Sequence, residues 1–117
     1  MSRATCFLSA LLLGPVLAFA QMAPDAIPDA SRSRELVRMV RQDCGSCHGM
    51  RLTGGLGPSL TREALADFPL ESLTAVIFHG RPGTPMPPWK AMLSEPEARW
   101  IALRLQQGFP EEVVKAP

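Results

Sequence analysis

The first clear helical pattern in the chain lies between residues 31 and 43. Apolar side chains recur there at intervals that place them on one face of a helix, namely Leu36, Val37, Met39 and Val40. Ser31 or Ser33 is expected to cap the start of this helix, because a serine hydroxyl accepts hydrogen bonds from the free amides of a first turn. No helix breaker follows, so we expect the helix to run directly into Cys44.

Two more helical segments are predicted in the middle of the chain. Thr61 is a suitable cap for a short helix over residues 61–67. The next segment covers residues 68–80, with Pro69 in its first turn and Gly80 at its end. Its apolar face is formed by Leu70, Leu73, Val76 and Ile77.

The last helix is predicted over residues 94–109. Ser94 and Glu97 have the spacing of a capping box, in which each side chain satisfies a backbone amide of the other residue, and Gly108 ends the helix. Its apolar face comprises Ala98, Ile101 and Leu105 and is widened by Trp100 and Leu103.

Two segments between the helices are expected to be loops. Residues 49–60 contain four glycines, and residues 81–89 contain four prolines. No segment of the chain alternates between apolar and polar residues as a half-buried strand does. The predicted fold class is therefore all-α with long connecting loops.

The N-terminus has the pattern of a signal peptide. Arg3 precedes an apolar run over residues 7–19, and Ala18-Phe19-Ala20 matches the small-residue pattern of a cleavage site. Gly14-Pro15 interrupts this run, which is shorter than the roughly 20 residues of a membrane span; an uncleaved anchor is the alternative. We therefore expect a mature chain without a membrane span, divided as follows: signal peptide 1–20, flexible leader 21–30, one domain 31–109 and a tail 110–117.

The charge of the chain argues against a nucleic-acid partner. The sequence has 12 Lys and Arg residues against 11 Asp and Glu residues, and loss of Arg3 with the signal peptide makes the two numbers equal. Nucleic-acid-binding domains usually carry a strongly basic face. Arg34, Arg38 and Arg41 are expected to form a solvated basic stripe opposite the apolar face of the first helix, a docking patch for an acidic partner being the alternative.

The residues with the clearest chemistry are Cys44, Cys47 and His48, in the sequence CGSCH. This C-x-x-C-H spacing is the attachment signature of c-type haem, in which two thiols form thioethers with one porphyrin and the histidine binds its iron. A structural zinc site would need a fourth ligand, and His79 is the only other His or Cys residue of the expected mature chain, which disfavours this alternative. A thioredoxin-like site would need neighbouring strands, and a short-range disulfide would leave His48 unexplained. We expect one covalently attached haem c.

The second axial ligand decides between function classes, because a six-coordinate haem iron mostly transfers electrons whereas an open site binds gases or does chemistry. Candidates besides Met86 are Met22, Met39, Met50, His79 and Met92. Met86 is favoured because flanking prolines hold its loop stiff, so its thioether loses little entropy on binding. His79 is expected as a polar residue at the end of its helix, and Met92 in packing. Trp89 is expected either to donate its indole N–H to a haem propionate or to pack under the loop.

The order of these features resembles class I cytochrome c over residues 31–109: a helix, C-x-x-C-H, a Gly-Pro loop, Met-Pro and a final helix. The resemblance implies that the carbonyl of Pro58 accepts a hydrogen bond from the second nitrogen of His48. It also implies that the first and last helices cross, through Leu36, Val37 and Val40 on one and Trp100, Ile101 and Leu105 on the other. Arg104 departs from the family, which commonly has an aromatic residue there, so Trp100 is expected to take over its packing.

Three segments are similar to the small periplasmic cytochromes encoded beside cytochrome cd1 nitrite reductase in denitrifying bacteria, namely CGSCHGMRLTGGLGPSL, HGRPGTPMPPW and EARWIALRL. This resemblance implies a carrier of single electrons, with cytochrome cd1 nitrite reductase as its partner. With the signal peptide and a six-coordinate iron, we expect a periplasmic monomer that is not an enzyme. The alternatives are a role in maturation of the haem d1 of that reductase, or a haem gas sensor or enzyme with a displaceable distal ligand. The expected contact face comprises residues 49–52, with Met50 and Leu52, and residues 82–88.

Overall fold

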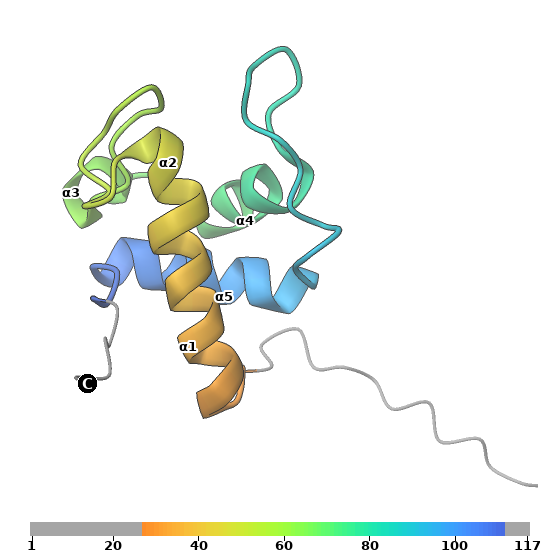
Figure 1. The fold of residues 1–117 in the computed structure, drawn as a ribbon. Coiled ribbons are helices and arrows are strands. Elements are labelled where there is room, and N and C mark those ends of the chain that lie inside the picture. Colours follow the sequence, from red (N-terminus) through yellow and green to blue (C-terminus); the bar gives the residue numbers. More distant parts are fainter. Residues whose placement is uncertain (1–26, 112–117) are drawn as a thin grey trace, which may run out of the picture.

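The computed structural model describes residues 27–111, and all regular elements within them are helices (Figure 1). In chain order these are α1 (Ala30–Met39), the π-helix η1 (Val40–Cys44), α2 (Gly45–His48), α3 (Arg62–Leu65), α4 (Leu70–His79) and α5 (Glu95–Gln107). The expected all-α fold is confirmed. The predicted signal peptide, Met22, the leader up to residue 26 and the tail from residue 112 lie outside the described residues. Within residues 27–111, no helix has the length and apolar character needed to cross a bilayer.

The first helix runs without a break through α1, η1 and α2 and so leads into the C-x-x-C-H motif, as expected. Its cap differs from the prediction. Asp29, rather than Ser31 or Ser33, accepts hydrogen bonds through Oδ1 from the amides of Ser31 (2.8 Å) and Arg32 (2.9 Å). A carboxylate at this place also faces the positive end of the helix dipole. Ser33 instead donates its hydroxyl to the carbonyl of Pro28 at 3.0 Å.

The π-helix η1 changes which side chains of the first helix reach the interior. Arg41 has an exposed fraction of 7%, so the expected solvated stripe of three arginines is wrong, although Arg34 and Arg38 are exposed. The wider turn of a π-helix departs from the 3.6-residue register on which that prediction rested. The Arg41 guanidinium donates to the carbonyls of Phe109 (2.8 Å) and Pro110 (2.9 and 3.1 Å) and lies over the Phe109 ring. It therefore holds the chain beyond α5 against the first helix.

The helices α3 and α4 lie close to their predicted positions. Thr61 caps α3 by accepting a hydrogen bond from the amide of Ala64 at 3.4 Å. Pro69 lies one residue ahead of α4 rather than in its first turn, and Gly80 ends the helix as expected. Val76 is only half-buried. The buried side chains of α4 are Leu73, Thr74 and Ile77.

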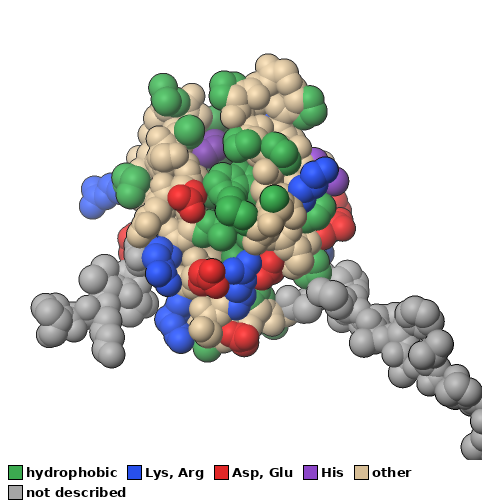
Figure 2. Space-filling view, turned by 45° about the vertical axis from the view of Figure 1, so that its right-hand side comes forward, with side chains coloured by type: hydrophobic (Ala, Val, Ile, Leu, Met, Phe, Trp, Pro, Cys, Tyr) green, Lys and Arg blue, Asp and Glu red, His purple; other side chains and the backbone are tan. Residues whose placement is uncertain are grey.

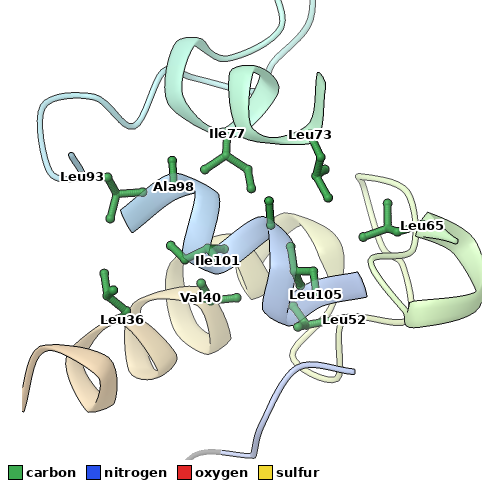
Figure 3. Packing of buried hydrophobic residues seen from close by; sticks show 11 residues of the cluster. Leu36, Val40, Leu52, Leu65, Leu73, Ile77, Leu93, Ala98, Ile101 and Leu105 are labelled. Atoms are coloured by element: carbon green, nitrogen blue, oxygen red, sulfur yellow. The ribbon is translucent and has the colours of Figure 1, made fainter. Parts of the chain in front are cut away.

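The core forms around α5, which begins with the expected capping box between Ser94 and Glu97. Figure 3 shows apolar side chains of the first helix, α3 and α4 converging on this helix. The buried cluster comprises Leu36, Val40, Leu52, Leu65, Leu73, Ile77, Leu93, Ala98, Ile101, Ala102 and Leu105. Leu103, expected to widen the apolar face, is 40% exposed, whereas Trp100 packs against the cluster and lies under the guanidinium of Arg104.

The first helix crosses α5, as the resemblance implies (Figure 1). Leu36 and Val40 contribute to the shared cluster at the crossing, whereas Val37 is only half-buried. At the N-terminal ends of α1 and α5, Arg32 donates to Glu97 Oε1 at 2.6 Å and to the carbonyl of Met92 at 3.0 Å. The hydrogen bond from Arg32 holds the pKa of Glu97 below its ordinary value. An ion pair therefore joins two helices that are distant in sequence.

Candidate haem attachment site

The C-x-x-C-H residues lie where η1 passes into α2. Cys44 ends η1 and is half-buried, and burial, with a smaller contribution from the charge of Asp43, raises the pKa of its thiol to about 11. Cys47 is exposed, and both thiols are free, so they do not form the alternative short-range disulfide. Among residues 27–111, no three His, Cys, Asp or Glu side chains are grouped so as to hold a metal ion, which disfavours a zinc site there.

The ring of His48, the last residue of α2, is fixed by one short hydrogen bond. Its Nδ1 lies 2.7 Å from the carbonyl oxygen of Pro58. Because a carbonyl can only accept, Nδ1 donates a proton in this bond, so in the neutral imidazole the lone pair that could bind a metal lies on Nε2. The structure thus contains the bond that the resemblance implies, and Pro58 takes part through its backbone.

The loop after α2 folds back under the end of that helix. The amides of Gly54 and Gly57 donate to the carbonyls of His48 and Cys47, both at 2.8 Å, and so satisfy acceptors that a helix end leaves free. Gly57 also lies against the imidazole, since a Cβ atom there would be 2.8 Å from both Cε1 and Nδ1 of His48. Gly57 was not among the residues predicted from the sequence, although a glycine directly before Pro58 was a signal that could have indicated it.

Leu52 was expected to be exposed on the contact face, but the structure buries it. Its exposed fraction is 3%, its backbone φ is 60°, and its side chain belongs to the core. The exposed apolar side chains of this loop are instead Met50, at 62%, and Leu56, at 95%. Figure 2 shows apolar side chains gathered between two lobes of one face, with a histidine at the upper end of the strip. Leu52 is therefore buried, contrary to the expectation, and the exposed leucine of this loop is Leu56.

Met86 is half-buried in the second loop, which connects α4 with the segment before α5. Figure 1 shows the two loops rising at the same end of the molecule, one beside α2 and α3 and the other above α4. The carbonyl of Met86 accepts a hydrogen bond from the amide of Arg81 at 3.2 Å. Its amide donates to the hydroxyl of Thr84 at 3.4 Å. The backbone of Met86 is thus held on both sides by its own loop.

The other candidate ligands have different surroundings. His79 is the exposed last residue of α4, with its ring edge-to-face against Phe78. Met39 packs against the core. Met92 is 52% exposed, so its expected packing role is wrong. Trp89 is half-buried against the core cluster, which favours the packing alternative for this side chain.

These residues fit a covalently bound haem. The end of the first helix supplies two free thiols and an imidazole whose Nε2 is available, and the loop after α4 supplies a thioether. A glycine leaves room for the imidazole, and loop amides already satisfy the carbonyls at the end of α2. The protein therefore positions the imidazole through contacts of its own backbone.

Known proteins share this combination of sequence and fold. The sequence model of the family described as cytochrome c oxidase, cbb3-type, subunit III, matches residues 31–103. A cytochrome c55X from Pseudomonas aeruginosa is 55% identical over 102 residues, which cover 85% of this chain and 86% of that protein. The solved structure of a c-type cytochrome NirC has a TM-score of 0.67 and 57% identity, covering 68% of this chain and 94% of that one. A dihydro-heme d1 dehydrogenase from Pseudomonas aeruginosa is 36% identical over 74 residues, which cover 63% of this chain and 15% of that protein.

Proposed function

Because this chain belongs to the c-type cytochromes of the cytochrome c55X family and carries covalently attached haem c, we propose that it transfers single electrons, with His48 and Met86 as axial ligands. The haem, when bound, supplies a one-electron iron couple. The observation that carries the proposal is the 2.7 Å hydrogen bond between His48 Nδ1 and the Pro58 carbonyl. This bond selects the tautomer that binds iron through Nε2 and makes the imidazole a stronger donor.

Met86 as the second ligand is supported by the stiffness of its loop. Its neighbours in the chain are Pro85 and Pro87, and its amide and carbonyl are both held by hydrogen bonds within the loop. A thioether raises the reduction potential relative to a second imidazole and so suits an electron carrier. If His48 and Met86 both bind the iron, no coordination site would be left for a substrate, and we propose that the protein is not an enzyme.

Cytochrome cd1 nitrite reductase is the acceptor that we propose. The similarity of both loops to cytochromes encoded beside that reductase supports this choice, as does the similarity to NirC. The exposed side chains of Met50 and Leu56 and the proline-rich Met86 loop offer a small apolar contact face. Transient redox complexes typically use contacts of this low-area kind.

A role in making haem d1 is the second candidate, and one observation favours it. A segment of a dihydro-heme d1 dehydrogenase is similar to this chain. Dehydrogenation of a dihydro-haem releases two electrons, which a carrier of single electrons would accept in two steps. In this role the present protein would receive electrons from such a dehydrogenase instead of delivering them to the reductase.

Export to the periplasm, with cleavage after Ala20, is part of the same proposal. It is supported by Arg3, the short apolar run and the Ala18-Phe19-Ala20 pattern. Intact mass spectrometry of the isolated holoprotein should show a chain that begins at Gln21. A mass that includes Met1–Ala20 would contradict it.

Stopped-flow mixing of the reduced protein with oxidised cytochrome cd1 nitrite reductase tests the choice of partner. Reduced protein should be oxidised while nitrite is consumed. Leu56→Glu should slow the transfer by about fivefold, because a charge on the contact face costs on the order of 1 kcal/mol. Arg38→Glu, on the exposed side of α1, is the matched control and should leave the rate unchanged.

Two other outcomes of the mixing experiment would contradict this choice of partner. If the reductase does not oxidise the protein but a dihydro-haem d1 dehydrogenase reduces it, the second candidate function replaces the first. If neither exchanges electrons with it, the assignment as an electron carrier of this system is wrong.

A further inference from the structure

The chain around Met86 returns to the place where its loop begins. Gly80, the residue that ends α4, is buried and has φ 71° and ψ −175°, a conformation that essentially only glycine adopts. A Cβ atom on Gly80 would lie 2.7 Å from the carbonyl carbon of Pro87 and the nitrogen of Pro88, and 2.8 Å from the carbonyl oxygen of Met86. All three are backbone atoms, so none could move aside by a change of side-chain rotamer.

Hydrogen bonds close the loop at the same place. The Arg81 amide donates to the Met86 carbonyl at 3.2 Å. The Thr84 hydroxyl donates to the Arg81 carbonyl at 2.7 Å and accepts from the Met86 amide at 3.4 Å. Farther along, the Lys90 amide donates to the Phe78 carbonyl at 3.1 Å. These hydrogen bonds join the two ends of the loop, residues 78–81 and residues 84–90, in what we call the neck of the loop. Gly80 lies in this neck, in direct contact with the backbone of residues 86–88.

We propose that Gly80 is a positioning residue for Met86. The missing side chain lets the backbone from Met86 to Pro88 lie directly against the end of α4, and this contact sets where the thioether is held. The inference rests on the proposed function, in which Met86 binds the iron. Since prolines restrict the backbone on both sides of Met86, a displacement at Gly80 would be transmitted to the thioether instead of being absorbed within the segment.

The loop contains its own matched control. Gly83 also has a positive φ, 77°, but a Cβ atom there would meet nothing within 4 Å. Gly80→Ala and Gly83→Ala therefore both place a side chain at a positive φ in the same loop, but only Gly80→Ala pushes against the backbone from Met86 to Pro88. The readouts are the weak near-infrared band of the ferric iron–thioether bond and the rate at which added imidazole replaces the thioether.

Gly80→Ala should weaken the near-infrared band and speed imidazole binding by at least about tenfold, the equivalent of a strained backbone position. Gly83→Ala should keep the band and the wild-type rate. The inference is wrong if Gly80→Ala folds, as judged by circular dichroism, and matches Gly83→Ala in both readouts.

A second variant covers the case in which Gly80→Ala does not fold. Thr84→Val removes two hydrogen bonds of the neck from an exposed position and should speed imidazole binding by about fivefold; an unchanged rate would overturn the inference in that case. Met86→Ala, measured alongside, separates the two proposals. If Met86→Ala keeps the near-infrared band, both Met86 as the ligand and the role of Gly80 are wrong. If Met86→Ala loses the band while Gly80→Ala keeps it at the wild-type intensity, only the role of Gly80 is wrong.

Discussion

At the scale of single residues, His48 shows which part of the site could be predicted from sequence. The C-x-x-C-H spacing indicated His48 as a ligand, because the residues that attach a c-type haem are close together in the sequence. The family resemblance then implied that the carbonyl of Pro58 is the hydrogen-bond partner of His48. The contact of Gly57 with the imidazole could not be predicted in the same way. It depends on the path by which the loop returns to α2, which no periodicity in the sequence encodes.

Gly57→Ala tests this contact. A methyl group 2.8 Å from the imidazole should displace the ring or the loop and weaken the bond from Nδ1 to Pro58. That bond is stronger when the iron is oxidised, so weakening it should raise the reduction potential, by up to roughly 40 mV for about 1 kcal/mol of differential hydrogen bonding. Redox titration measures the shift. An unchanged potential, equal to that of Gly83→Ala, would show that Gly57 does not control the ring.

At the scale of elements, the sequence predicted helices better than it predicted their faces. Caps and glycine stops are local signals, and the boundaries of α3, α4 and α5 followed from them. The prediction that Arg41 lies on the exposed face of the first helix was wrong, because it assumed the register of an α-helix, whereas η1 is a π-helix. The partners of Arg41 lie at the far end of the chain, so only the tertiary structure shows them.

Arg41→Met should destabilise the protein by about 2 kcal/mol, because the carbonyls of Phe109 and Pro110 lose their buried donor. Guanidinium chloride unfolding of the ferric holoprotein, followed by circular dichroism, measures the change. Arg38→Met, on the exposed face of the same helix, should stay within about 0.5 kcal/mol of wild type. Equal stability of the two variants would mean that Arg41 does not anchor the chain beyond α5.

The ion pair between α1 and α5 should appear in the pH dependence of stability. The pKa of Glu97 is lowered in the folded protein, chiefly by the hydrogen bond from Arg32, so its contribution is fully present above the pKa of the unfolded chain, about 4.3, and is lost as the pH falls through the folded pKa. Glu97→Gln should therefore cost about 1 kcal/mol at neutral pH. Unfolding measured over a pH series should show this difference from wild type narrowing below about pH 4. A difference that stays constant with pH would exclude the carboxylate charge as its cause.

At the scale of the whole molecule, α5 and the helices around it form a core on which two loops stand at one end (Figure 1). One loop follows Cys44, Cys47 and His48, and the other carries the thioether of Met86. The candidate haem-binding residues therefore lie at one end of the helical core. The proposed contact face could be predicted only in outline, because the exposure of side chains in a glycine-rich loop depends on how that loop folds. Leu52 is buried in the structure, whereas Leu56 is exposed. Since basic and acidic residues number 12 and 11, long-range steering of a partner should be weak, and the transfer rate should change by less than about threefold with ionic strength.

The near-infrared absorption spectrum of the ferric holoprotein tests the central claim most directly, because a six-coordinate haem iron mostly transfers electrons, whereas an open site binds gases or does chemistry. With His48 and Met86 as ligands, the wild-type protein and Met92→Ala should be low-spin and show the iron–thioether band, and Met86→Ala should lack it. A high-spin wild-type spectrum, or a band that survives in Met86→Ala, would contradict the account.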